Sequence, residues 1–429
     1  MRSYNAQRDV LLPVPAEPVN RERLACPDCG LLQQLPAARI KGHVVECGRC
    51  GRVLAGPATG RVDAPLALAV AALLLLVPAY TAPLLIVSTF GAVRETWLPS
   101  TVFGMWRDGF PSLGILIAAF SIALPILFLT MVIRVLVGLH RGRVAGLGSL
   151  YRWIKHLRPW VMIEVYLVGG FVAYSRIKVV ANVDVAMGGW CLIAATLVLM
   201  LAITQLDDRT VWEALPIRKP AERKTKEGAG DGRVVGCTVC DLIAAPGWDL
   251  HHCARCGARL HRRKPDSMRR TAALVIAGYL LYIPANVLPV LTIVRFGRED
   301  RNTILSGVME LVQNHLLPLA IIVFAASIVL PLVKLFSLTW MLVATRLRSR
   351  QLLVTRTRLY RAIDLVGRWS NIDVYAVATL VAILQFGALT AVHSGNGMVA
   401  FAAVVILTMG ATSYFDPRLM WDAPVPRHE

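Results

Sequence analysis

The chain has 429 residues, of which 56% are hydrophobic and only 17% are charged, and its mean hydropathy is +0.56. This composition is too apolar for a soluble protein of that length and predicts several membrane spans. The net charge of +19 would suggest nucleic acid as the partner of a soluble protein. Because most lysines and arginines lie in short stretches between apolar runs, we interpret them as topology signals and expect no nucleic-acid partner.

The N-terminal segment, residues 1–60, is polar and holds the first four cysteines. They form two CxxC knuckles, CPDCG (26–30) and CGRCG (47–51), and four thiolates at such spacing suit a tetrahedral zinc ion. A glycine follows each knuckle, which permits the positive φ angle that a tight turn needs. We therefore expect a tail and a zinc ribbon here, with one zinc ion bound by Cys26, Cys29, Cys47 and Cys50.

Beyond this ribbon, eight apolar runs are long enough to cross a bilayer, which takes about 20 residues. The runs are residues 65–88, 112–138, 159–176, 185–205, 270–294, 316–345, 371–391 and 397–415. Four prolines are expected to kink or unwind the first run of each half, namely Pro78, Pro83, Pro284 and Pro289. The sequence therefore predicts an α-helical polytopic membrane protein with eight transmembrane helices.

The loops between these runs alternate in positive charge. The loop after the second run carries five lysines and arginines and the loop after the sixth carries seven, whereas the loops on the opposite side hold fewer. The positive-inside rule places the richer loops in the cytoplasm. We therefore expect both termini, and the segment 206–269, to be cytoplasmic.

A charged, glycine-rich linker (216–233) leads to a second cysteine module, CTVC (237–240) followed by CARCG (253–257). We expect a second zinc ion there, bound by Cys237, Cys240, Cys253 and Cys256. A structural zinc that folds a small module without a core is one reading. Two others stay open, since a rubredoxin-like iron site uses similar knuckles and the same sulfurs would serve zinc sensing or thiol redox chemistry.

The chain is a tandem repeat. The cysteines recur 206 to 211 positions later, and VPAYTAP (77–83) matches IPANVLP (283–289). Each unit is one cysteine module followed by four spans, so the halves are parallel rather than inverted. We divide the chain into a tail with the first ribbon (1–60), a first membrane domain (61–215), a linker with the second ribbon (216–265) and a second membrane domain (266–429).

A lysine, Lys334, stands in the middle of the sixth run, 12 residues before Arg346. At 1.5 Å per residue it lies about 18 Å along the helix from the cytoplasmic end. The lysine side chain is too short to bring its ammonium group from that depth to the membrane surface. An ionisable group at that depth is a functional-site hypothesis by default. We expect it to work with Asp373, at the start of the seventh run, and with hydroxyls of Ser327, Ser370 and Thr408.

The repeat sharpens the case for this polar cluster. The offsets place Phe128 at the position of Lys334 and Glu164 at that of Asp373, and only Ser327 keeps its identity, as Ser121. Because the fold forms without the lysine in the first half, we expect the cluster to serve substrate handling or proton coupling. A purely structural Lys334–Asp373 pair is the alternative. We interpret Glu164, near a helix N-terminus, as interfacial.

The connections between the first and second runs are amphipathic in both halves, VFGMWRDGF (102–110) and ILSGVMELVQNHLL (304–317). Such segments can lie along a membrane surface or dock a partner.

A duplicated cysteine module with four spans, together with VPAYTAP, IPANVLP and WSNIDVY (369–375), resembles the paraquat-inducible protein A family of bacterial inner-membrane proteins. The resemblance covers nearly the whole chain. It implies zinc-ribbon domains, tetraspanin-like membrane domains and a polar cluster in the second membrane domain. It also implies intermembrane lipid transport, with MCE-domain proteins that form a tunnel across the periplasm as partners.

We therefore expect an inner-membrane protein that loads or extracts phospholipid for an MCE-domain tunnel protein and so supports envelope integrity. No GxxxxGK[ST] and no GxSxG motif is present in the sequence, so neither direct ATP use nor an enzymatic function is expected. Two alternatives come from other classes: a membrane redox protein with iron at the cysteines, and a zinc-dependent scaffold without transport activity.

Overall fold

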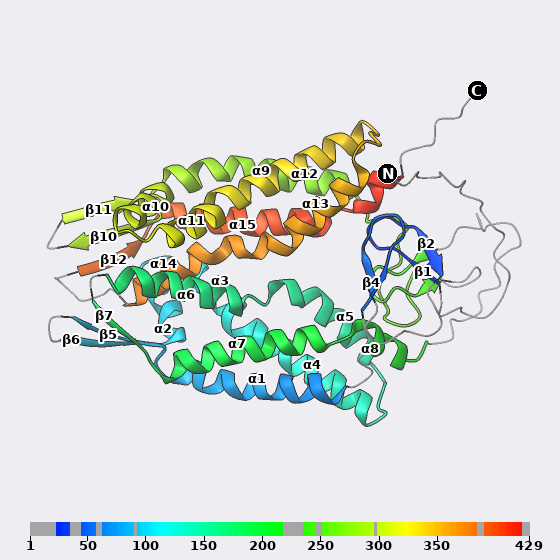
Figure 1. Ribbon diagram of the computed structural model, residues 1–429, viewed down its shortest axis with the longest axis horizontal. Helices are drawn as coiled ribbons and strands as arrows, with labels where there is room; N and C mark the ends of the chain where they lie inside the picture. Colours follow the sequence, from blue (N-terminus) through cyan, green and yellow to red (C-terminus); the bar gives the residue numbers. More distant parts are fainter. Residues whose placement is uncertain are drawn as a thin grey trace, which may run out of the picture.

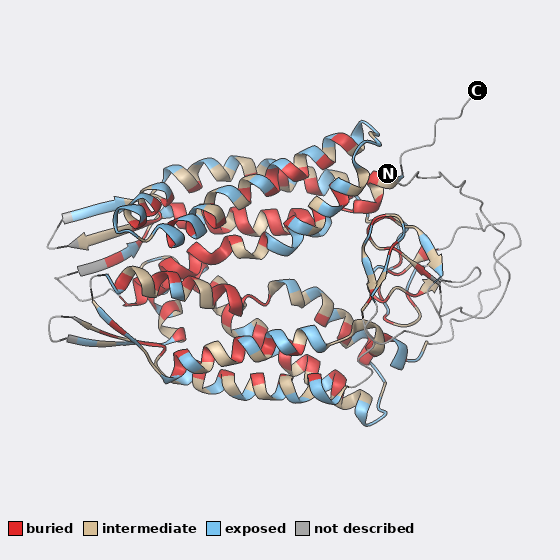
Figure 2. Ribbon diagram, viewed as in Figure 1, coloured by how far each residue is buried: buried red, intermediate tan, exposed pale blue. Residues whose placement is uncertain are grey.

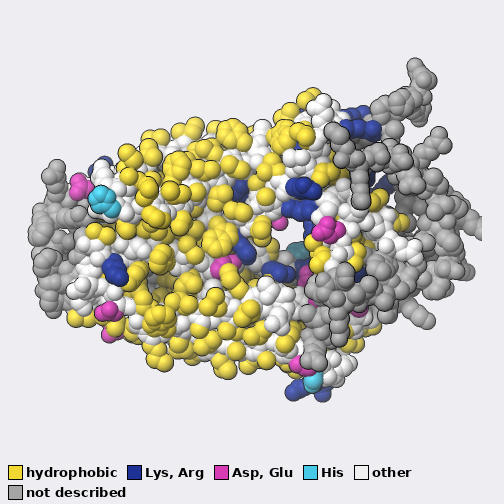
Figure 3. All heavy atoms as spheres, in the orientation of Figure 1, with side chains coloured by type: hydrophobic (Ala, Val, Ile, Leu, Met, Phe, Trp, Pro, Cys, Tyr) yellow, Lys and Arg dark blue, Asp and Glu magenta, His cyan; other side chains and the backbone are white. Residues whose placement is uncertain are grey.

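The computed structural model describes residues 23–34, 44–56, 62–89, 92–179, 181–217, 235–244, 251–295, 298–383 and 390–422. Long helices run side by side along the molecule (Figure 1), two three-stranded sheets project at one end, and the cysteine modules lie at the other. We call these the sheet end and the ribbon end. Hydrophobic side chains cover most of the helical face that Figure 3 shows, as expected of a surface in contact with lipid.

The first half begins with a small β module and continues with helices and a sheet of order β6-β5-β7 at the sheet end. Its elements are β1 (Arg23–Ala25), β2 (Leu32–Gln34), β3 (Val45–Glu46), β4 (Val53–Ala55), α1 (Asp63–Thr81), β5 (Leu85–Thr89), β6 (Ala92–Thr96), α2 (Leu98–Arg107), α3 (Pro111–Ala118), η1 (Ala119–Ala123), α4 (Leu124–His140), α5 (Leu147–Leu157), η2 (Arg158–Trp160), α6 (Ile163–Ile177), β7 (Asn182–Val185), α7 (Met187–Gln205) and α8 (Asp208–Ala214).

The second half repeats this order, with a sheet of order β11-β10-β12. Its elements are β8 (Val235–Gly236), β9 (Ile243–Ala244), α9 (Ser267–Val287), β10 (Leu291–Arg295), β11 (Arg298–Asn302), α10 (Ile304–Gln313), α11 (Leu317–Phe324), η3 (Ala325–Val329), α12 (Leu330–Arg346), α13 (Leu353–Val366), η4 (Gly367–Asn371), α14 (Ile372–Ile383), β12 (Thr390–Ser394), α15 (Asn396–Tyr414) and η5 (Pro417–Trp421). The tandem repeat expected from the sequence is thus visible as two copies of one topology.

Within the described residues, seven helices rather than eight are long and apolar enough to cross a membrane. They are Asp63–Thr81, Pro111–His140, Leu147–Ile177, Met187–Gln205, Ser267–Val287, Leu317–Arg346 and Asn396–Tyr414. The run predicted at 371–391 forms the 12-residue helix α14, and its continuation at 384–389 lies outside the described residues. All 12 residues of α14 are buried, because it packs against α6 and α2 between the two halves (Figure 2).

The first run of each half is shorter than predicted. Helix α1 ends at Thr81 and α9 ends at Val287, and each is followed by a strand instead of further helical turns. The proline two residues beyond each end, Pro83 or Pro289, cannot continue the helix. The β-branched residues that follow, as in Leu85–Thr89, favour a strand. The predicted amphipathic connections do form helices, α2 and α10, at the same sheet end (Figure 1).

The long second helix of each half contains one π-helical turn, η1 or η3, directly before a Leu-Pro pair. A proline inside a helix lacks the N–H that would bond the carbonyl four residues earlier and pushes that carbonyl away. In the first half this carbonyl belongs to Ser121, and it accepts a hydrogen bond from the Tyr80 hydroxyl at 2.8 Å. The equivalent turn of the second half includes Ser327, so the π turn sets the position of a predicted site residue.

Candidate functional site

The first cysteine module brings its four sulfurs together at the ribbon end. All four cysteines are buried, and their Sγ atoms lie within 4.8 Å of one another. Two Sγ–Sγ distances, Cys26–Cys50 and Cys29–Cys47, are both 3.6 Å. A tetrahedral ion with metal–sulfur bonds of about 2.3 Å separates its sulfurs by about 3.8 Å. The four sulfurs therefore fit a metal ion of that size without rearrangement.

The second module has the same geometry. Its sulfurs also lie within 4.8 Å of one another, with Cys237–Cys256 at 3.6 Å and Cys240–Cys253 at 3.4 Å. Its shorter spacing between the knuckles does not change the site. The protein thus carries two buried four-cysteine clusters that suit two metal ions.

Each knuckle closes with a backbone hydrogen bond back to the carbonyl of its first cysteine, as from Gly30 N to Cys26 O at 2.8 Å. Three of the four closing residues are the glycines expected from the sequence, with φ near +70°. The fourth is Asp241, at φ 57°, a residue type that tolerates this region better than most.

The two ribbons dock crosswise on the membrane domains. Ribbon 1 (the described residues of 23–56) contacts the second half, because Arg361 of α13 pairs with Asp28 at 2.9 Å and donates to the Cys50 carbonyl at 2.6 Å. Ribbon 2 (the described residues of 235–260) contacts the first half, where Lys155 of α5 donates to the Val239 carbonyl at 3.1 Å. Nothing in the sequence indicates this exchange, since we assigned these cations to topology alone.

Asp28 anchors the first of these contacts. Its side chain is 3% exposed and also pairs with Arg52 of its own ribbon. The positive charges of Arg52 and Arg361 compensate the buried carboxylate, which would otherwise be costly to desolvate. Ribbon 1 is therefore fixed to the helix that leads into η4, the centre of the polar cluster.

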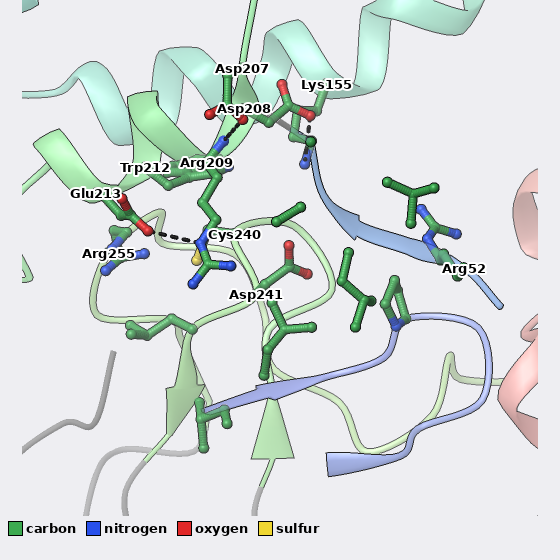
Figure 4. Close-up of a pocket in the computed structure, with 18 residues that line it drawn as sticks. Arg52, Lys155, Asp207, Asp208, Arg209, Trp212, Glu213, Cys240, Asp241 and Arg255 are labelled. Atoms are coloured by element: carbon green, nitrogen blue, oxygen red, sulfur yellow. Dashed lines mark hydrogen bonds and ion pairs between the residues drawn. The ribbon is translucent and has the colours of Figure 1, made fainter. Parts of the chain in front are cut away.

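A cavity of about 220 Å³ separates ribbon 1, ribbon 2 and α8 (Figure 4). Its charged side chains largely pair with each other, as Lys155 does with Asp208 at 3.3 Å and Arg209 with Glu213 at 2.8 Å. Asp241 also lines the cavity, and burial raises the pKa of its carboxyl. The internal pairing makes this cavity a joint between the ribbons rather than a charged binding site.

The five residues of the predicted polar cluster lie on elements that pack around η4, and all five are buried. Lys334, on α12, is 1% exposed. Its Nζ donates to the Thr408 hydroxyl of α15 at 2.9 Å and to the Gly367 carbonyl at 3.2 Å. Residue 367 is a glycine, and an added Cβ there would lie 3.0 Å from Nζ, close enough to displace the end of this side chain slightly.

Asp373 belongs to a second part of the cluster and forms no ion pair with Lys334. Its carboxylate accepts a hydrogen bond from Ser327, on the π turn η3. Ser370 is buried in η4, and its hydroxyl has no hydrogen-bond partner. The structure therefore brings the five residues into one region but divides them into two hydrogen-bonded pairs and one hydroxyl without a partner.

Glu164, the first-half counterpart of Asp373, has a different environment. Its side chain is 9% exposed and pairs with Arg368 of η4 at 2.9 Å. Glu164 is thus buried and joined to the other half by this ion pair, whereas Asp373, at the equivalent position, bonds to Ser327 of η3.

Comparison with known proteins agrees with this architecture. The family model described as Paraquat-inducible protein A matches residues 62–216 and 268–424, once per membrane domain. The chain is similar to the Intermembrane transport protein PqiA of Escherichia coli K12, with 30% identity over 95% of this chain and 98% of that protein. It is also similar to the Lipophilic envelope-spanning tunnel protein A of the same organism, with 28% identity over 93% and 91% of the two chains. No solved structure matches the chain significantly.

Proposed function

The chain belongs to the paraquat-inducible protein A family, and from this premise we propose that it is the inner-membrane component of an intermembrane lipid transport system. Three relatives that cover nearly the whole chain carry transport or tunnel names. In our proposal the protein loads phospholipid onto, or extracts it from, an MCE-domain tunnel protein. The ribbon end faces the cytoplasm with both chain termini, and the sheet end faces the periplasm and the partner.

The observation that carries the proposal is the buried pair of Lys334 and Thr408. An ammonium group within a membrane domain is costly unless something compensates it. The hydrogen bonds of Nζ go to neutral oxygens, on Thr408 and Gly367, and the carboxylate of Asp364 acts on it without an ion pair. The first half has the same topology with Phe128 at this position and Leu199 at that of Thr408. Because the fold forms without the pair, we assign it to attraction of a headgroup phosphate or to proton transfer.

Asp373 is the second ionisable group of this proposed path. Its carboxylate accepts a hydrogen bond from Ser327 of η3. A proton or a polar headgroup that moves along η4 would meet both hydrogen-bonded pairs. Ser370 of η4, whose hydroxyl has no hydrogen-bond partner, is available to hydrogen-bond the passing group.

We further propose that both four-cysteine clusters bind zinc and that the zinc is structural. Ribbon 1 has a small core built around its four cysteines, so a metal ion would supply most of its folding free energy. The cysteines of ribbon 2 join the larger core of the protein, and there a metal ion would add to that packing. The proposed division of the chain is unchanged: ribbon 1 in 1–60, a membrane domain in 61–215, ribbon 2 in 216–265 and a membrane domain in 266–429.

The proposal is tested by purifying the full chain from its native membrane with an affinity tag on an MCE-domain partner. We expect the two proteins to co-purify, phospholipid to be found in the complex by mass spectrometry, and two zinc ions per chain by metal analysis. Absence of both partner and phospholipid would contradict the transport function. A visible absorption spectrum with stoichiometric iron would instead favour a redox protein.

A further inference from the structure

A second cavity, of about 60 Å³, opens at the sheet end between the two halves. Helix α6 of the first half forms one side, and β10, α10, α14 and β12 of the second half form the others. Its volume exceeds the roughly 15 Å³ that one water molecule needs. It is lined by Arg176, Ile177, Val179, Leu291, Ile293, Glu310, Leu311, Asn314, Leu316, Leu380 and Val392, so two charges stand in a mostly apolar wall.

Arg176 is the positive charge of this cavity. The guanidinium lies against α10, where a Cβ on Gly307 would be 3.4 Å from Nη2, and its Nε is buried without a hydrogen-bond partner. Among the residues that the structure describes, no carboxylate forms an ion pair with it, although the charges of Asp373 and Glu310 are close enough to act on it. A largely buried guanidinium that no carboxylate pairs with directly is costly, and it is typical of sites that bind an anion.

Glu310 is the negative charge of the same cavity. It comes from α10, as Gly307 does, but its carboxylate forms no ion pair with Arg176. One cation and one anion therefore line one cavity without a direct ion pair between them, although the charge of Glu310 is close enough to act on Arg176. That arrangement is complementary to a ligand that carries both charges a short distance apart.

We propose that this cavity is a binding site for a zwitterionic phosphoethanolamine headgroup, with the phosphate on Arg176 and the ammonium on Glu310. The inference rests on the proposed transport function and deepens it by naming the headgroup class at the sheet end. The apolar residues of the wall, such as Leu291 and Leu316, provide the surface that the glycerol and acyl chains would contact. Arg176 also links this site to the polar cluster, because it lies within electrostatic range of Asp373.

Glu310 is not required by the repeat, because the offset of 206 places Gly104 of the first half at its position. The cavity lies at the junction, where the end of a first-half helix meets the second-half sheet. A headgroup held there would lie at the end of the molecule that we assign to the periplasmic partner.

The test is native mass spectrometry of the full chain in detergent with four dioctanoyl or soluble probes. These are phosphatidylethanolamine, phosphatidylglycerol (phosphate without ammonium), dioctanoylglycerol (no phosphate) and free phosphoethanolamine. We expect phosphatidylethanolamine to bind about tenfold or more tightly than phosphatidylglycerol, because it adds a charge-assisted hydrogen bond. Arg176→Gln should weaken both phospholipids by at least tenfold, and Glu310→Gln should remove only the preference between them.

Lys178→Gln is the matched control, since Lys178 is exposed at the same helix end, lies over the Tyr174 ring and is not part of the cavity. It should bind all probes as the unchanged protein does. Arg176→Lys should bind the phospholipids more tightly than Arg176→Gln, and this binding would show that a change at residue 176 leaves the chain folded. Equal binding of both phospholipids, or Gln variants that bind like the unchanged protein, would overturn the site. Equally tight binding of free phosphoethanolamine would overturn its assignment to lipid.

These outcomes also separate the two proposals. A chain that binds phospholipid normally after Arg176→Gln, but no longer delivers it after a change at Lys334, would remove the headgroup site and leave the transport function. A chain that binds neither phospholipid would contradict the transport function itself.

Discussion

Replacement of Arg361 by glutamine should release ribbon 1 from the second membrane domain. The side chain makes an ion pair with Asp28 at 2.9 Å and donates to the carbonyls of Cys50 at 2.6 Å and Gly51 at 3.3 Å. Hydrogen bonds to charged groups contribute about 1.5–3 kcal/mol each, but the arginine side chain is 27% exposed, so solvent screens part of that. We expect a net loss of roughly 2–3 kcal/mol of docking free energy, which is about a 30- to 150-fold shift toward the undocked ribbon.

Hydrogen–deuterium exchange of the peptides that contain Cys26 and Cys50 measures this shift directly. Arg358→Gln is the matched control, because Arg358 lies on the same helix, α13, and is exposed. Faster exchange of ribbon 1 in Arg361→Gln, with unchanged exchange in Arg358→Gln and in ribbon 2, is the expected result. If Arg361→Gln exchanges like the unchanged protein, the crosswise docking described here does not stabilise the ribbon.

Three further predictions concern other parts of the chain. Gly367→Ala should displace the Lys334 ammonium by a few tenths of an ångström and slow lipid delivery at unchanged protein level, as measured by transfer to the partner. Burial alone would raise the pKa of Asp416, but hydrogen bonds from Arg418 hold this pKa below its usual value. The stabilisation that ionised Asp416 provides is therefore present above about pH 4 and lost below it. The melting temperature should consequently fall more steeply with acid in the unchanged protein than in Asp416→Asn. Removal of metal by a chelator should unfold both ribbons before the helices, as read from cysteine alkylation.

Much of the architecture was predictable because it depends on periodic patterns. Long apolar runs, positive loops and the 206-residue repeat each report a property that many residues share, and the structure confirms the helical fold with two equivalent halves. The two clusters of cysteine sulfurs were also predictable, since the CxxC spacing determines the local geometry of each knuckle. Ser327 and Asp373, both assigned from the sequence to one polar cluster, are hydrogen-bonded to each other in the structure.

What the sequence could not provide depends on contacts between distant segments. The cysteine modules dock on the opposite halves through Arg361 and Lys155, and nothing in either loop distinguishes a docking cation from a topology signal. Lys334 bonds to Thr408 and to the Gly367 carbonyl rather than to Asp373, and these partners come from segments whose packing the sequence does not reveal. We predicted the first apolar run of each half as one continuous helix, although Pro83 lies where the helix changes to a strand.

The central claim, that the second membrane domain uses Lys334 to move phospholipid, is tested by transfer of a fluorescent phospholipid from proteoliposomes to the MCE-domain partner. Lys334→Met keeps the length and packing of the side chain but removes its charge. The account predicts a transfer rate at least tenfold lower in Lys334→Met, at unchanged protein level and unchanged partner binding. A rate equal to that of the unchanged protein would contradict it.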